Sequence, residues 1–282
     1  MKVLALLLAL TFGAAVGASC TGGENDEQQP GTATPGATEA ASPATPGGTE
    51  PASTATPPAL TPEARPTPTP GAYEPSSDKD NLFGNPGFEE GTQYWFALHE
   101  EALQTSNIAH SGQASAYLRM RDDADVQDAK AYSIVQEMAP EQFPELISGF
   151  YRVEDWRRGT ENQYLQLTVV VFAPTNLGGQ YPNYQMHYPL VGLAEIPFAI
   201  DNARFNFVSR DFEPRQEEWV YFEANIKKDF EEQWTAVPEG YSKIRVISEV
   251  RFDGKVAGLP VWADVYYDDL YMGPADANPN KP

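Results

Sequence analysis

The sequence predicts an all-β domain, an antiparallel β-sandwich, in the part of the chain that begins at Asn81. Aromatic residues make up 12% of the 282 residues. None of them occurs between Thr21 and Ala72, so they are concentrated later in the chain. That later part contains short segments in which apolar and polar residues alternate, separated by Gly and Pro. Alternation with a period of two is typical of half-buried strands, and several such segments predict a sandwich or jelly roll.

Five segments carry the strongest strand pattern. They span, in chain order, residues 147–153, 164–172, 219–226, 244–252 and 261–272. In the last segment, successive side chains are expected to alternate between the two faces of the sheet. One face would carry Val261, Ala263, Val265 and Tyr267, and the other Trp262, Asp264 and Tyr266. A helical period occurs only at residues 136–146, where two prolines interrupt it.

The N-terminal segment resembles a bacterial lipoprotein signal. Lys2 precedes an apolar run, and small residues then lead to Cys20, the only cysteine in the chain. In such a signal residues 1–19 are removed and Cys20 is acylated. The protein would then be extracytoplasmic, lipid-anchored to a bacterial cell membrane or outer surface, with no other membrane contact. Gly17 departs from the pattern, which usually has Leu or another aliphatic residue there, and simple secretion with a free Cys20 is the alternative.

Composition divides the rest of the chain. Residues 20–80 are rich in Thr, Pro, Ala, Gly and Ser and cannot bury enough apolar surface to offset the entropy of ordering. We expect a disordered Thr/Pro-rich linker there, which could reach roughly 190 Å if fully extended at ~3.1 Å per residue. Residues 81–274 are expected to form one β-sandwich binding domain with an extra loop region at 174–210. Residues 275–282 are expected to be a disordered tail.

Charge argues against two classes of partner. The formal net charge is −21 at pH 7, of which about −15 lies from Asn81 onward. Such a domain is repelled by nucleic acids and by anionic lipid surfaces, whereas neutral ligands and cations are not repelled.

Signatures of catalysis are weak, and we expect no enzyme. The histidines His99, His110 and His187 do not show a metal-binding spacing such as H-E-x-x-H. There is no G-x-S-x-G nucleophile elbow, and Cys20 lies outside the expected fold. A glycoside hydrolase needs two carboxylates at a set separation, which a sequence does not display.

Five motifs occur in the order found in one fold family. They are NPGFEEG (85–91) followed by Trp95, HSGQASAYL (110–118), SGFYRV (148–153), EWVYF (218–222) and YDDLYMG (267–273). Together they resemble carbohydrate-binding modules with the galactose-binding-like jelly-roll fold, over nearly all of residues 81–274. The resemblance implies a non-catalytic domain that binds carbohydrate, such as a cell-envelope glycan. The alternatives are a structural or protein-binding module of the envelope and, less favoured, a glycoside hydrolase.

A pair of carboxylates is expected where the first and last strands meet. Two like charges at close range need a counter-charge, and a hard cation such as Ca²⁺ supplies one. In the modules that the chain resembles, a structural Ca²⁺ is held by the Glu of the first strand, an Asp of the last strand and carbonyls of a turn. Carried over, the resemblance implies Glu89, Asp269, and carbonyls near Asn85, Ser111 and Gln113. The alternative is that both carboxylates are hydrogen-bonded or solvated without a metal.

Aromatic side chains are the candidates for ligand contact, because sugars stack their C–H faces on flat rings. Trp156 and Trp234 lie in loop-like contexts. The extra loop region adds Tyr181, Tyr184 and Tyr188. The alternative is that this region folds back and covers the sheet with its own hydrophobic side chains. Trp95 and Trp219 correspond to core positions of the resembling modules, so we expect them to pack.

Overall fold

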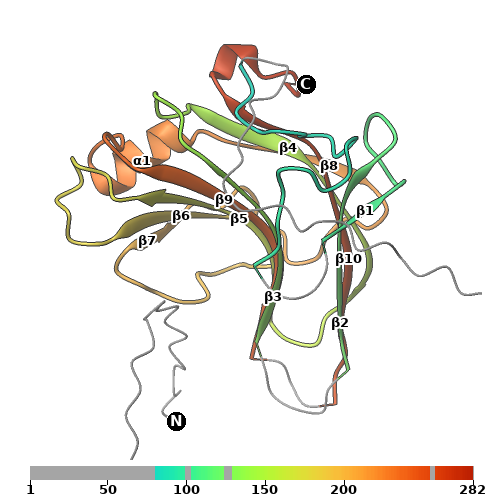
Figure 1. Ribbon diagram of the computed structural model, residues 1–282. Helices are drawn as coiled ribbons and strands as arrows, with labels where there is room; N and C mark the ends of the chain where they lie inside the picture. Colours follow the sequence, from blue (N-terminus) through green and yellow to red (C-terminus); the bar gives the residue numbers. More distant parts are fainter. Residues whose placement is uncertain (1–79, 99–102, 124–128, 255–257, 282) are drawn as a thin grey trace, which may run out of the picture. The chain divides into compact units, whose positions relative to one another are not determined.

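The computed structural model describes residues 80–98, 103–123, 129–254 and 258–281 (Figure 1). All of them belong to one compact unit, Glu63–Pro282. The expected signal peptide, Cys20 and the expected linker as far as residue 79 lie outside the described residues. Within the described part, no helix has both the length and the apolar character needed to cross a membrane.

Two five-stranded sheets form the domain, as the sequence predicted (Figure 1). The first sheet has the order β1 (Gln104–Ser106), β2 (Ser115–Asp122), β10 (Val261–Gly273), β4 (Leu146–Arg157) and β8 (Trp219–Ala224). The second has the order β3 (Lys130–Met138), β9 (Lys243–Asp253), β5 (Asn162–Phe172), β6 (Asn183–Val191) and β7 (Ala203–Phe205). All neighbouring strands are antiparallel except β6 and β7, which are parallel.

The core lies between the sheets and follows the predicted alternation. On β10, the side chains of one face are fully buried: Val261, Ala263, Val265 and Tyr267. On the other face Trp262 and Asp264 are partly exposed. Tyr266 departs from this, because neighbouring side chains bury it to 5% exposure. Burying a side chain of Val or larger size stabilises the fold by about 1.5–3 kcal/mol, so this alternation selects which face packs inward.

The one helix of more than a single turn in the described part is not where the sequence pattern placed it. Residues 136–146 form no helix, because β3 runs through Met138 and a prolyl loop follows. Helix α1 (Ile226–Trp234) instead follows β8, which ends at Ala224. Asn225 caps it, since its side-chain oxygen accepts a hydrogen bond from the backbone N–H of Lys228 at 3.0 Å.

Two segments that were expected to be irregular are ordered. The extra region at 174–210 contributes β6 and β7, which extend the second sheet beside β5. The tail expected to be disordered contains the single-turn helix η1 (Ala275–Ala277) and packs onto the first sheet as far as residue 281. There the Asn280 side chain donates to the carbonyl of Asp269 at 2.5 Å, and Asn278 donates to the Tyr221 hydroxyl at 3.0 Å.

Candidate functional site: a pocket at the edge of the sandwich

Both carboxylates of the predicted pair bond to the 110–114 turn, in an arrangement we call the strand–turn clamp. Its members are Glu89, His110, Ser111, Gln113, Asp268 and Asp269. Asp268 is fully buried on β10 and accepts backbone hydrogen bonds from His110 at 2.7 Å and Ser111 at 3.2 Å. The next carboxylate, Asp269, is bonded to the Ser111 hydroxyl and to the His110 ring nitrogen Nδ1, both at 2.7 Å.

Glu89 joins the same turn from the other side. Its Oε1 accepts the backbone N–H groups of Gln113 at 2.8 Å and Ala114 at 3.1 Å. Gly112 permits this approach, because it has φ +62° and a Cβ there would lie 2.1 Å from Glu89 Oε1. The clamp therefore ties the entry to the domain, the 110–114 turn and the last strand together.

The carboxylates of the clamp are already bonded to hydrogen-bond donors of the protein. The turn presents N–H groups rather than carbonyls to Glu89 and Asp268. The carbonyl of Asn85 already accepts from Phe88 N–H at 3.2 Å and from Trp95 Nε1 at 3.0 Å. Among the described residues, no three His, Cys, Asp or Glu side chains are grouped so as to hold a metal. The carboxylates thus have partners without a cation, and the calcium site stays a prediction.

Charge in the clamp is nevertheless only partly compensated. Burial, and second the neighbouring charge of Asp269, raise the pKa of the Asp268 carboxyl to about 6. The three backbone N–H groups that it accepts act in the opposite direction, because they stabilise the ionised form.

Of the five aromatic residues predicted to bind a ligand, three are buried and two are partly exposed. Tyr184, Tyr188 and Trp156 are 2%, 1% and 8% exposed. Tyr181 and Trp234 are partly buried against the core, and both meet the Tyr184 ring edge to face, with centroids 5.6 and 4.9 Å away. A buried ring has no face free for a sugar, so Trp156, Tyr184 and Tyr188 serve as packing, as the alternative for this region proposed.

The two tryptophans expected to pack behave differently. Trp95 is 1% exposed and stacks on Phe83 with centroids 5.3 Å apart, so its prediction is confirmed. Trp219 lies on the outer face of β8 and is partly exposed, because Val220 and Phe222 take the inward positions of that short strand.

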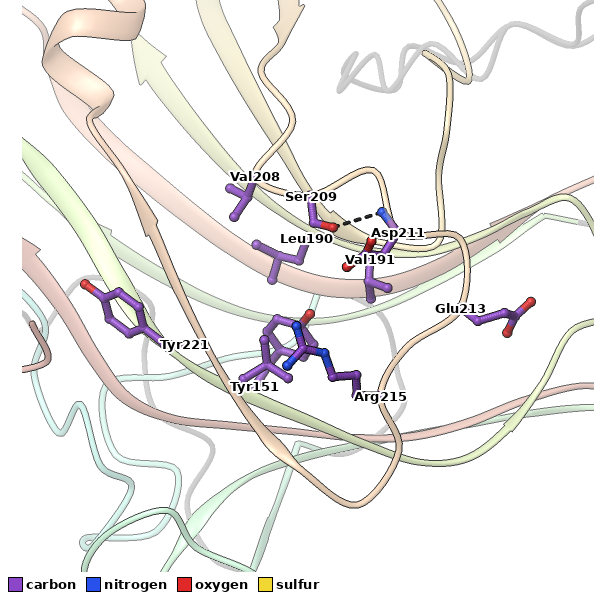
Figure 2. Close-up of a pocket in the computed structure, with 10 residues that line it drawn as sticks. Tyr151, Leu190, Val191, Val208, Ser209, Asp211, Glu213, Arg215 and Tyr221 are labelled. Atoms are coloured by element: carbon purple, nitrogen blue, oxygen red, sulfur yellow. Dashed lines mark hydrogen bonds between the residues drawn. The ribbon is translucent and has the colours of Figure 1, made fainter. Parts of the chain in front are cut away.

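An open pocket of about 180 Å³ lies where the edges of the two sheets meet (Figure 2). The first sheet contributes Tyr151 of β4 and two residues of β8, and the second contributes the end of β6. The connection from β7 to β8 supplies the polar rim. The lining residues are Tyr151, Leu190, Val191, Val208, Ser209, Asp211, Glu213, Arg215, Val220 and Tyr221.

Tyr151 is the group that gives the pocket its chemistry. Its side chain belongs to the core cluster and is 5% exposed. No hydrogen bond of its hydroxyl is present among the residues that the structure describes. Burial raises the pKa of this phenol to about 12, while the nearby Arg215 lowers it and Asp211 raises it. A neutral hydroxyl, able both to donate and to accept, therefore faces the pocket.

The rim is held by backbone hydrogen bonds. The Asp211 carbonyl accepts from Gly192 N–H at 2.8 Å, and its own N–H donates to the Ser209 hydroxyl at 2.9 Å (Figure 2). Glu213 points away from the pocket in Figure 2 and is ion-paired with Arg158 at 2.8 Å. Asp211 therefore remains as the carboxylate at the pocket mouth, beside the guanidinium of Arg215.

The pocket was not predicted from the sequence, although one signal was available. Asp211 and Arg215 belong to a polar run that directly precedes a predicted strand at 219. A polar loop next to a strand edge is a common position for a binding site. What the pattern lacked was the partner surface, because Tyr151 and Leu190 come from strands far away in the sequence.

No protein-family model matches the chain, and no curated protein matches it in sequence. Solved structures do match, and they include carbohydrate-binding modules as well as enzymes, such as a bacteriophage tailspike protein and an α-L-arabinofuranosidase. TmCBM61 in complex with β-1,4-galactotriose is 14% identical with a TM-score of 0.38, over 68% of this chain and 97% of that one. The xylan-binding domain from CBM 22 is 12% identical with a TM-score of 0.39, over 70% and 96%. A non-crystalline cellulose specific module, CBM28, is 14% identical with a TM-score of 0.37, over 67% and 94%.

Proposed function

We propose that this protein is a surface-anchored, non-catalytic lipoprotein that binds carbohydrate in the edge pocket. The observation that carries the proposal is the nearly buried, unbonded hydroxyl of Tyr151, which faces a pocket with Asp211 and Arg215 at its mouth. The floor beneath is apolar, since Leu190 and Val191 are 1% and 2% exposed. An apolar surface with a few placed polar groups is what a sugar ring needs.

The chemistry of the three polar groups is complementary to a polyol. Asp211 accepts hydrogen bonds from two hydroxyls, Arg215 donates to ring or hydroxyl oxygens, and Tyr151 does either. Ligand pockets for larger molecules span roughly 300–1,000 Å³. A pocket of about 180 Å³ therefore suits one sugar unit held in place by the apolar floor.

The arrangement of the carboxylates at the pocket supports binding of a glycan without its hydrolysis. Glycoside hydrolysis requires an acid and a second carboxylate on opposite sides of the scissile bond. Here Glu213 is turned outward to Arg158, and Asp211 stands alone at the mouth. Anchoring is proposed from the signal pattern that ends at Cys20, with the Thr/Pro-rich segment as the tether.

A glycan array on the full chain in mild detergent tests the function. Each glycan that binds on the array is then titrated into the parent protein and into two variants, Tyr151→Phe, which removes only the hydroxyl, and Arg215→Gln. We expect each variant to bind at least tenfold more weakly, about 1.4 kcal/mol, with an unchanged melting temperature. Lys228→Gln is the matched control, because Lys228 is exposed on α1 and is not among the residues that line the pocket. An array without hits would instead support the structural or protein-binding module, and release of sugar from a bound glycan would contradict the non-catalytic role.

A further inference from the structure

Aromatic side chains cross the outer face of the first sheet in register. Tyr117 of β2 pairs with Tyr266 of β10, Tyr266 pairs with Arg152 of β4, and Arg152 pairs with Trp219 of β8. One step along the strands, Phe150 of β4 pairs with Tyr221 of β8. We call Tyr117, Tyr266, Trp219, Phe150 and Tyr221 the outer aromatic row. Neighbouring strands are ~4.8 Å apart, so Tyr117 lies directly beside Tyr266, while Arg152 lies between Tyr266 and Trp219.

Two pairs of rings in this row contact each other, and the His110 ring of the clamp stacks on Phe150 at 3.6 Å and lies edge-on to Trp219 at 5.8 Å. Tyr117 and Tyr266 stack with centroids 5.1 Å apart, and Phe150 and Tyr221 lie 5.5 Å apart. Four of the five are partly exposed, and only Tyr266 is buried. The solvated face of an antiparallel sheet is ordinarily polar, so a row of rings here is a departure that packing inside the core does not explain.

The row is continuous with the pocket. Tyr221 is among the residues that line the pocket (Figure 2). Its ring also lies 5.5 Å from the Phe150 ring on the outer face. It lies on β8, which is the edge strand of its sheet, and Trp219 points to the same outer side two residues earlier. A ligand that leaves the pocket over this edge strand therefore meets Tyr221 and Trp219 first, and Tyr266 and Tyr117 beyond them.

Two arginines on this face are in ion pairs. Arg152 is bonded to Glu154 at 2.5 Å, and Arg121 is bonded to Asp264 at 2.7 Å and to Asp155 at 3.0 Å. With those groups neutralised, and a domain of about −15 behind them, the face attracts no acidic polymer. Flat rings beside paired polar groups match the C–H faces and hydroxyls of neutral sugars.

We infer that the ligand is the end of a neutral glycan chain: its terminal sugar occupies the pocket, and the following sugars lie over β8 along the outer aromatic row. This inference rests on the proposed function, since the pocket must first hold a sugar. It adds the length of the ligand and the direction in which the chain leaves the pocket.

The test compares chain lengths. Galacto-, xylo- and cello-oligosaccharides of one to six units are titrated calorimetrically against the full chain and its variants. For the series that binds, we expect affinity to rise with length, and Trp219→Ala to weaken the longest chain about tenfold while leaving the monosaccharide unchanged. Tyr151→Phe should weaken every length. Trp219→Phe, which keeps a ring, should retain most of the gain and shows that lost binding is not lost folding.

Trp262→Ala is the matched control, because Trp262 lies on the same face but four residues along β10 from the row. It should leave all affinities unchanged. The extended site is contradicted if affinity does not depend on chain length, or if the Trp219→Ala variant binds the longest chain as tightly as the parent. Either result leaves the proposed sugar site in the pocket unaffected. If no oligosaccharide of any length binds, the proposed function fails, and this extension fails with it.

Discussion

Two single residues, Gly112 and Tyr151, each determine how distant segments of this domain meet. Gly112 shows it in the clamp, where the 110–114 turn lies directly against the Glu89 carboxylate. Tyr151 shows it in the pocket, where a core ring places its hydroxyl at the surface. Adding a Cβ at Gly112 would disturb the clamp, and removing the hydroxyl of Tyr151 would remove a polar group from the pocket.

Gly112→Ala is expected to destabilise the domain by about 2–4 kcal/mol. The left-handed backbone at φ +62° disfavours a Cβ, and that Cβ would displace the Glu89 carboxylate from two N–H donors. Gly178→Ala is the control, because Gly178 has φ +81° and nothing within 4 Å of an added Cβ. It should cost only about 1–2 kcal/mol. Urea denaturation measures both, and equal losses would contradict the role of the Glu89 contact.

His187 makes stability depend on acid pH. Burial, and second the charge of Arg251, lower the pKa of its imidazole from 6.5 to about 3. The unfolded chain therefore binds a proton below pH 6.5 that the folded chain does not bind until about pH 3. Stability from this group is complete above 6.5 and falls as the pH drops through that window, by about 2 kcal/mol between pH 7 and 5.

Denaturation at the two pH values, compared between the parent and His187→Gln, isolates this contribution. The variant lacks the titrating group, so its stability should change less by about that amount. Identical pH dependence in the two proteins would show that the imidazole is not held neutral in the folded state.

At the scale of elements, the region at 174–210 decides the character of the second sheet. It supplies β6 and β7 and buries its tyrosines beneath α1, where Tyr184 meets Trp234. Its end becomes part of the pocket wall through Val208 and Ser209. A region that was expected to be a loop thus extends a sheet and positions a site at the edge of the sandwich.

The strand–turn clamp is the second junction between elements, and it contains the residues of the predicted calcium site. If the predicted ion binds at Glu89 and Asp269, free calcium at 100 times the dissociation constant would add about 2.7 kcal/mol to the free energy of unfolding. A chelator would then lower the melting temperature of the parent protein. Glu89→Gln should lose most of this response, because an amide is a weaker calcium ligand than a carboxylate. A melting temperature that a chelator does not move would leave the clamp held by hydrogen bonds alone.

At the scale of the whole molecule, the sequence predicts an acidic domain carried on a tether. Replacing Cys20 by Ala should release the protein from the membrane fraction and abolish its labelling by fatty acid, because no other anchor is expected. Ser19→Ala keeps a small residue before the cysteine and should stay in the membrane fraction. A Cys20→Ala protein that still sediments with membranes would contradict the lipid anchor.

Sequence periodicity by itself predicted the class of the fold and five of the ten strands that the described residues form. The strands expected at 164–172, 244–252 and 261–272 agree with β5, β9 and β10 to within two residues at each end. The strand expected at 147–153 is shorter than β4, and the one expected at 219–226 runs past the end of β8 into α1. The motifs at both ends of the domain also placed Glu89 beside the turn that holds Asp269. These features are local, or join segments whose pairing the motif order implies.

Only the tertiary structure decided where a ligand can be held. Among the aromatic residues that the sequence favoured, Tyr184 and Tyr188 of β6 turned inward, where the Tyr184 ring packs against Trp234 of α1. The pocket appeared instead where Tyr151, Leu190 and Asp211 meet, from three segments that are separate in the chain. Alternation of apolar and polar residues indicates which side of a strand is buried. A site at a sheet edge depends instead on which strand ends lie next to each other. That arrangement arises from long-range packing, which no local pattern encodes.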